Sequence, residues 1–275
     1  MWRLSDILDI KNILGSNVDR SQVIRIQYAT ADPTIYLSCT GGINIVSIKS
    51  GKVIRDYRTD LNLINVSVQS DANTPFAIYG NVTELIADND CLFDLSQNDS
   101  LEYLTSRVNS LLTSLDLSNR QNLIVATIAD CYNLTSVNTS GCLNLKALIL
   151  NNCTSLVTLI PSVNIEELQL ENTAIQDLNL SNLQILNNLS IAGMTSLQSL
   201  YIKSLILTSI LIDGSETNIE NINCRAMHLG VANDIATLIN NATSTTGDLY
   251  IRPSDPYSGT ITSAAYNKGW TVHTF

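Results

Sequence analysis

A repeat with a period of about 11 residues runs through the middle of this 275-residue chain and constrains its fold more than any isolated motif does. The repeated pattern is L-x-x-L-x-L, in which Ile, Val or another residue can replace Leu. Fourteen units match it in phase, and neighbouring units begin 9 to 12 residues apart. Their first residues are Val82, Leu92, Leu101, Leu112, Leu123, Leu134, Leu145, Leu156, Ile165, Ile175, Leu186, Leu197, Leu207 and Ile219.

A single unit is too short to form one coil of a leucine-rich-repeat solenoid, because such coils need about 20–29 residues. Two successive units are therefore expected to form one coil of about 22 residues, which gives about seven coils over residues 80–228. In each unit, positions 1, 4 and 6 point inward and stack on the neighbouring coil, so the core exists only where coils are stacked. The predicted fold class is α+β and mostly β, with a leucine-rich-repeat solenoid at its centre.

The segments on either side of the repeat have other patterns. Residues 1–20 predict a short amphipathic helix, with Ser5 as a candidate cap. Residues 21–79 predict a small antiparallel β domain, because short alternating runs are separated by turn residues such as Gly41-Gly42. Residues 229–275 predict a helix–strand cap that covers the apolar end of the last coil. The expected strands of the β domain are 23–30, 34–38, 43–48, 52–57 and 64–70.

Several stretches resemble a known family. The repeats LTSLDLSNRQNL (112–123), LTSVNTSGCLNL (134–145) and LKALILNNCTSL (145–156) resemble the short leucine-rich repeats of surface and adhesion-type proteins of gut Bacteroidetes. The lead-in GNVTELIADND (80–90) and the ending SGTITSAAYNKGWTVHTF (258–275), which contains KGWTV, resemble the start and the C-terminal cap of such arrays. The resemblance covers roughly 200 residues. It implies a binding scaffold and no shared catalytic motif.

Charge and hydropathy exclude some classes of partner. The net charge of −10 argues against nucleic acid, since binding to phosphates depends on Lys and Arg. Residues 1–60 carry a net charge of +2, so a basic-leaning head precedes an acidic body. No run of about 20 apolar residues predicts a membrane span. Asp6 and Asp9 interrupt the first apolar stretch, so we expect no signal peptide within this sequence.

Candidate catalytic and metal-binding groups have simpler structural interpretations. Cys131, Cys142 and Cys153 each occupy position 9 of their unit, where a ladder of buried thiols is the favoured interpretation; a disulfide or metal site is the alternative. His228 and His273 are the candidate general bases, and no nucleophile motif surrounds any cysteine. The acidic residues Glu166, Glu167, Glu171 and Asp177 favour a solvated strand face over a cation site. We therefore predict no catalytic residues, no metal and no cofactor.

The coil geometry indicates where a partner could bind. Positions 3, 5 and 7 of a unit point outward, because side chains alternate along a strand. One row of these positions combines apolar residues with a polar border, which is typical of partner surfaces, and we favour it as the concave face. The opposite row, which runs from Asp94 through Ser114, Ser136, Thr158, Asp177 and Ser199 to Asn221, is small and polar. The predicted ligand-binding residues are Tyr103, Thr105, Arg107, Val125, Thr127, Ala147, Ile149, Glu167, Gln169 and Glu171.

These observations predict a non-enzymatic binding or adhesion protein that recognises a protein or glycan through the solenoid sheet. Its expected location is extracellular or at a bacterial cell surface. The alternative is a structural virion-associated protein, a decoration or tail protein of a phage that infects Bacteroidetes. The oppositely charged N-terminal domain motivates this alternative, because it could dock on a larger assembly.

Overall fold

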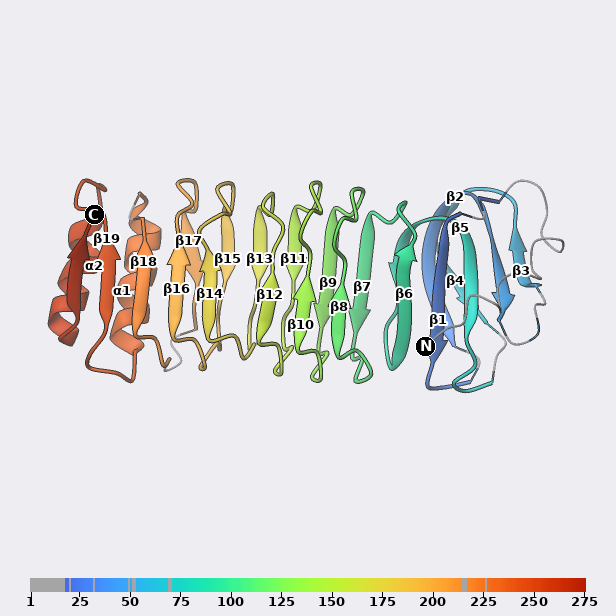
Figure 1. The fold of residues 1–275 in the computed structure, drawn as a ribbon, viewed down its shortest axis with the longest axis horizontal. Helices are drawn as coiled ribbons and strands as arrows, with labels where there is room; N and C mark the ends of the chain where they lie inside the picture. Colours follow the sequence, from blue (N-terminus) through green and yellow to red (C-terminus); the bar gives the residue numbers. More distant parts are fainter. Residues whose placement is uncertain are drawn as a thin grey trace.

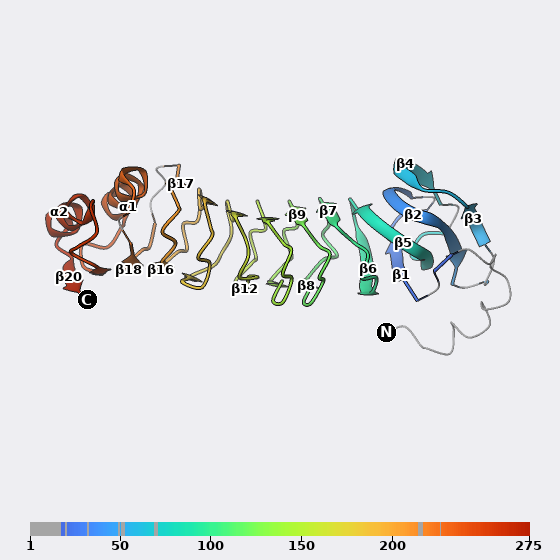
Figure 2. The ribbon, with the colours of Figure 1, turned by 90° about the horizontal axis from the view of Figure 1, so that it is seen from above.

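The computed structural model describes residues 18–19, 21–31, 33–48, 50, 53–68, 71–213, 217–225 and 227–275. These residues form an elongated solenoid with a β unit at the N-terminal end and two helices at the C-terminal end (Figure 1). Seen from above, the coils follow one another in a nearly straight row (Figure 2). The amphipathic helix predicted over residues 1–20 lies outside the described residues, apart from Val18 and Asp19.

Each coil contributes one strand to each of two opposite faces, which confirms that two 11-residue units form one coil. On the first face, strands of successive coils pair in parallel and form part of one sheet, which we call sheet A. Val125, for example, lies beside Ala147 of the next coil. The seven strands of this face match the predicted number of coils. They are β5 (Phe76–Ile86), β7 (Tyr103–Arg107), β9 (Val125–Ala129), β11 (Ala147–Ile149), β13 (Glu167–Gln169), β15 (Asn188–Ser190) and β17 (Ser209–Leu211).

The second face is divided into two parallel sheets, so the opposite row of residues falls into two parts, with Ser114, Ser136 and Thr158 in one sheet and Asp177, Ser199 and Asn221 in the other. Sheet B ends at Ile160, directly before Pro161, and proline has no N–H to donate to a strand ladder. Sheet B contains β8 (Ser114–Asp116), β10 (Ser136–Asn138) and β12 (Thr158–Ile160). Sheet C begins with β14 (Asp177–Leu180), β16 (Ser199–Ile202) and β18 (Asn221–Cys224).

The predicted row is wrong at its first member, Asp94. Strand β6 (Cys91–Gln97) does not pair with β8; it pairs antiparallel with β1 (Val23–Tyr28), where Arg25 lies opposite Asp94. Arg25 is buried, and its Nη1 lies 3.2 Å from Oδ2 of Asp94. A buried arginine paired in this way fixes β6 to the N-terminal unit, because separating the two would leave a buried charge unpaired.

The N-terminal unit is antiparallel, as predicted, but the turn predicted at Gly41-Gly42 is wrong. A single strand, β2 (Thr34–Ser47), runs through both glycines, which have φ of 74° and 86°. The register against β5 shifts between Thr40 and Asn44, so the glycines form a bulge within the strand. The remaining strands of the unit are β3 (Val53–Tyr57) and β4 (Leu61–Ser67).

Strand β5 joins the N-terminal unit to the solenoid. Its first half pairs antiparallel with β1, and its last residues begin the parallel ladder with β7, where Glu84 lies beside Tyr103. Sheet A is therefore continuous across residue 80. The division of the chain at residues 79 and 80 stays a prediction.

Alternation of side chains along each strand produces the core. In the unit that begins at Leu145, the inward residues Leu145, Leu148 and Leu150 are completely buried, while Ala147 and Ile149 between them are half-buried. Each buried Leu side chain contributes about 1.5–3 kcal/mol relative to an exposed one. The corner thiols Cys131, Cys142 and Cys153 are buried and unoxidised, which agrees with the favoured ladder interpretation.

The C-terminal cap replaces the strands of the first face with helices. Helix α1 (Leu229–Asn241) buries Val231, Ile235, Leu238 and Ile239, the residues expected on its apolar side. The predicted terminal strands are present as β19 (Asp248–Ile251) and β20 (Thr271–Thr274), which extend sheet C in parallel. Helix α2 (Ser258–Lys268), which lies between them, was not predicted.

Helix α1 also covers the free edge of sheet A. The Oδ2 atom of Asp234 accepts a hydrogen bond of 2.6 Å from the backbone N–H of Ile210 in β17. Gly230 allows this close approach, because a Cβ atom there would lie 2.1 Å from the carbonyl oxygen of Thr208. Helix α1 therefore covers the edge of β17, the last strand in this direction of sheet A.

Candidate recognition surface

Sheet A brings the ten predicted binding residues onto one face of the solenoid. Tyr103, Val125, Ala147 and Glu167 lie in one row across β7, β9, β11 and β13, because each is in register with the next. Thr105, Thr127, Ile149 and Gln169 form the adjacent row. Arg107 ends β7, and Glu171 follows β13. Their placement follows from the repeat; their role in binding stays a prediction.

The centre of this face is apolar. Val125, Ala147 and Ile149 point outward and are half-buried by their neighbours. Tyr103 retains 41% of its exposure at the N-terminal side of the patch. On the same side Arg107 is held by Asp88, with Nη2 of the arginine 3.2 Å from Oδ2 of the aspartate. The face thus offers an apolar centre next to a tyrosine and an ion pair.

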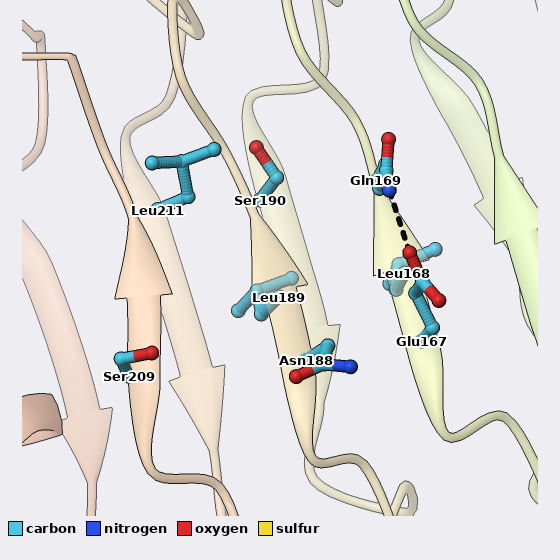
Figure 3. Close-up of a pocket in the computed structure, with 8 residues that line it drawn as sticks. All are labelled: Glu167, Leu168, Gln169, Asn188, Leu189, Ser190, Ser209 and Leu211. Carbon is cyan, nitrogen blue, oxygen red and sulfur yellow. Dashed lines mark hydrogen bonds between the residues drawn. The ribbon is translucent and has the colours of Figure 1, made fainter.

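The C-terminal part of the face is hollowed and polar. A hollow of about 180 Å³ lies over β13, β15 and β17 (Figure 3). Glu167, Asn188 and Ser209 lie at one level of neighbouring strands, and Gln169, Ser190 and Leu211 lie at the next. Leu168 and Leu189 form the rest of the lining. Two of these residues, Glu167 and Gln169, belong to the predicted binding set.

Hydrogen bonds fix one side of the hollow. Gln169 donates from Nε2 to Oε1 of Glu167 over 2.6 Å, and its Oε1 accepts from Asn151 over 3.0 Å. Ser190 donates to Glu171 over 2.7 Å. Within the described part of the chain, the side chains of Asn188 and Ser209 make no hydrogen bond, so a carboxamide and a hydroxyl remain for a ligand.

The predicted set did not include Asn188, Ser190, Ser209 or Leu211. The repeat indicates their position, because Asn188 and Ser209 occupy position 3 of the units that begin at Leu186 and Leu207, which are the corresponding units of the next two coils after Glu167. Leu211 is 57% exposed, a large value for a leucine. The predicted set follows the apolar residues and charges of the face, and these four residues continue the same two rows.

The acidic residues noted in the sequence do not converge. Glu166 forms an ion pair with Lys146, and Glu171 is bound by Ser190, while Asp177 lies on β14 of the opposite face. Across the described ranges, no group of three or more His, Cys, Asp or Glu side chains is placed to hold a metal ion. These acidic residues therefore occupy separate positions on the two faces.

Each of the two histidines has a partner nearby, which for His228 lies in the loop before β17 and for His273 lies on β19. Nε2 of His228, at the start of α1, lies 3.2 Å from the carbonyl oxygen of Leu205. Nε2 of His273 lies 2.7 Å from Oδ1 of Asp248.

No helix among the described residues is long and apolar enough to span a membrane.

Comparisons with known proteins add little to this description. No protein-family model matches the chain, and no curated protein is similar to it. Among solved structures, the chain is similar to the functional domain of InlJ from Listeria monocytogenes, which includes a cysteine ladder. The sequence identity is 15% and the TM-score is 0.18, and the match covers 57% of this chain and 57% of that one. The stacked parallel strands themselves show the fold, a leucine-rich-repeat solenoid that is mostly β.

Proposed function

We propose that this chain is a non-enzymatic recognition module that binds a protein or glycan partner on the outward face of sheet A. The observation that supports the proposal is the composition of that face. Its half-buried centre of Val125, Ala147 and Ile149 is bordered by Tyr103 and, on the other side, by the polar hollow that includes Glu167. An apolar centre with a polar border is typical of partner-binding surfaces.

The shape of the face also supports binding to a macromolecule. Short parallel strands from successive coils present their side chains in straight rows, so one partner can contact several coils at once. The face lies between the N-terminal β unit and helix α1, and both limit where a partner can sit (Figure 2). We include display outside a bacterial cell in the proposal, which rests on the resemblance of the repeats alone.

Charge reversal at the centre of the face tests the proposal. The labelled 275-residue chain is applied to arrays of extracellular proteins and of glycans, and each bound molecule is then measured by titration. Val125→Lys with Ile149→Lys should weaken binding by at least about tenfold, because two desolvated contacts become charged. Ser114→Lys with Thr158→Lys is the matched control, since it adds the same charge to sheet B.

Equal affinity of the sheet A variant and the unchanged chain for every bound molecule would reject this surface. Circular dichroism and thermal unfolding of each variant establish that the solenoid is intact. If the sheet B variant alone lost binding, the partner would lie on the second face.

A further inference from the structure

The outward face of sheet C carries a row of aromatic and carboxamide side chains that the repeat pattern does not show. Tyr201, Asn223, Tyr250 and His273 lie side by side on β16, β18, β19 and β20, because each is in register with the next. These strands lie together at the C-terminal end of the solenoid (Figure 1). The row belongs to the opposite face from sheet A, so it is separate from the surface proposed above.

The aromatic rings are held in position. Tyr250 and His273 stack with their centroids 4.5 Å apart and their planes at 13°. Nε2 of His273 lies 2.7 Å from Oδ1 of Asp248, which fixes the imidazole. Since His273 covers one face of Tyr250 from the side of β20, the other face of Tyr250 is directed along the sheet toward β18.

The order of these residues places a shorter side chain between two tyrosines. Tyr201 and Tyr250 are two strands apart, which corresponds to about 9.6 Å, and the smaller Asn223 lies between them. Tyr250 is 37% exposed, and neither tyrosine hydroxyl has a hydrogen-bond partner within the part of the chain that is described. A flat ring of a ligand can therefore lie above Asn223 with a tyrosine on each side.

The border of the row has the polar groups that hydroxyls bind. Asn221 and Asp248 lie in the adjacent row on β18 and β19, so a carboxamide and a carboxylate lie beside the rings, while Ser199 of the same row is buried. The negative faces of aromatic rings attract the partly positive C–H groups of a sugar ring. Nucleic acid does not fit here, because it needs a continuous basic groove.

We propose that this row is a second binding surface, specific for a neutral glycan, with one sugar ring held between Tyr201 and Tyr250 above Asn223. The ring stacks against the free face of Tyr250, and its hydroxyls reach the border of Asn221 and Asp248. The proposal does not depend on a partner at sheet A.

The test uses the 275-residue chain and neutral hexasaccharides: cello-, xylo- and manno-oligosaccharides with β linkages and malto-oligosaccharide with α linkages. Isothermal titration should detect binding of at least one of them. Tyr201→Ala with Tyr250→Ala should weaken that binding by at least about tenfold, since both stacking faces are lost. Tyr250→Phe keeps the ring and should change the affinity by no more than about threefold. Tyr266→Ala, an exposed tyrosine of α2 outside the row, is the matched control.

Two results would overturn the proposal. One is the failure of all four oligosaccharides to bind the intact chain at millimolar concentration. The other is unchanged affinity of the double tyrosine variant with its thermal transition intact. Loss of glycan binding in the Val125→Lys, Ile149→Lys variant together with normal binding in the tyrosine variant would assign the glycan to sheet A, which would reject this inference and support the proposed function.

Discussion

Asn172 donates a hydrogen bond of 2.7 Å from its Nδ2 to Oδ1 of Asn152, which occupies the same corner position one coil earlier. Asn152 repeats the contact with Oδ1 of Asp130 over 2.9 Å. All three residues have a left-handed backbone, with φ between 56° and 58°. Asn and Asp tolerate this conformation better than other residues with a side chain. The same three residues therefore fit the left-handed corner and hydrogen-bond to one another through their side chains.

Val108 occupies this corner position in the preceding coil and is a poor residue for it. Its φ is 54°, where a β-branched side chain is strained. Val108→Asn should therefore raise the free energy of unfolding by about 1 kcal/mol, measured by urea denaturation. Val163→Asn is the control, because Val163 is also exposed but lacks a positive φ; we expect a change within about 0.5 kcal/mol. A loss of stability in Val108→Asn would contradict the assignment of strain.

Arg120 joins two strands that do not pair with each other, β6 and β8. Its Nη1 donates to the carbonyl oxygens of Leu95 and Asn98 over 3.1 and 3.2 Å and to Asp99 over 2.9 Å. Arg120→Ala should lower the free energy of unfolding by about 1–3 kcal/mol, because carbonyls in a partly buried site lose their donor. Arg107→Ala, which breaks the exposed pair with Asp88, should cost less than about 1 kcal/mol. Equal losses in chemical denaturation would show that Arg120 does not hold this junction.

Asp94 gives the fold an acid-sensitive contact. Burial raises its pKa, but hydrogen bonds from Ser96 and the charge of Arg25 outweigh burial, so the pKa lies below the ordinary value of 3.8. A lowered folded-state pKa contributes stability that is present above the unfolded value and is lost as the pH falls through the folded value. The free energy of unfolding should therefore fall more steeply below about pH 4 in the unchanged chain than in Asp94→Asn. Between pH 6 and 8 the two curves should run parallel; parallel curves at every pH would exclude this contribution.

The buried thiols should be unreactive in the folded chain. Burial raises the pKa of Cys224 to about 12, and burial is also the main cause that raises the pKa of Cys91 to about 12. Because the thiolate is the reactive form, an aromatic disulfide reagent at pH 8 should label these thiols only as fast as the chain opens. All six cysteines should react within the mixing time in 6 M guanidinium chloride. Rapid labelling of one thiol under native conditions would show that its corner of the solenoid is open.

Much of the solenoid could be predicted because its period is a local property of the chain. The spacing from Tyr103 to Val125 to Ala147 alone indicates which residues share a row, and the structure places them in register. Alternation along a strand then decides which side chains point inward, as Leu145, Leu148 and Leu150 do. The residues of the predicted face could therefore be named from the sequence. The hollow beside it could not be predicted, because its shape depends on the side chains of three neighbouring coils.

The sequence by itself determined the coil, its two strands and the residues of each row, because a repeat applies the same local rules in every unit. Only the tertiary structure decided the exceptions. The strand through Gly41-Gly42, the pairing of Asp94 with Arg25 and the break after Ile160 depend on contacts between segments whose partners the repeat does not specify. The row from Tyr201 through Tyr250 to His273 arises for the same reason: α1 and α2 replace strands in the cap, so the spacing between its neighbours no longer follows the period of 11 residues.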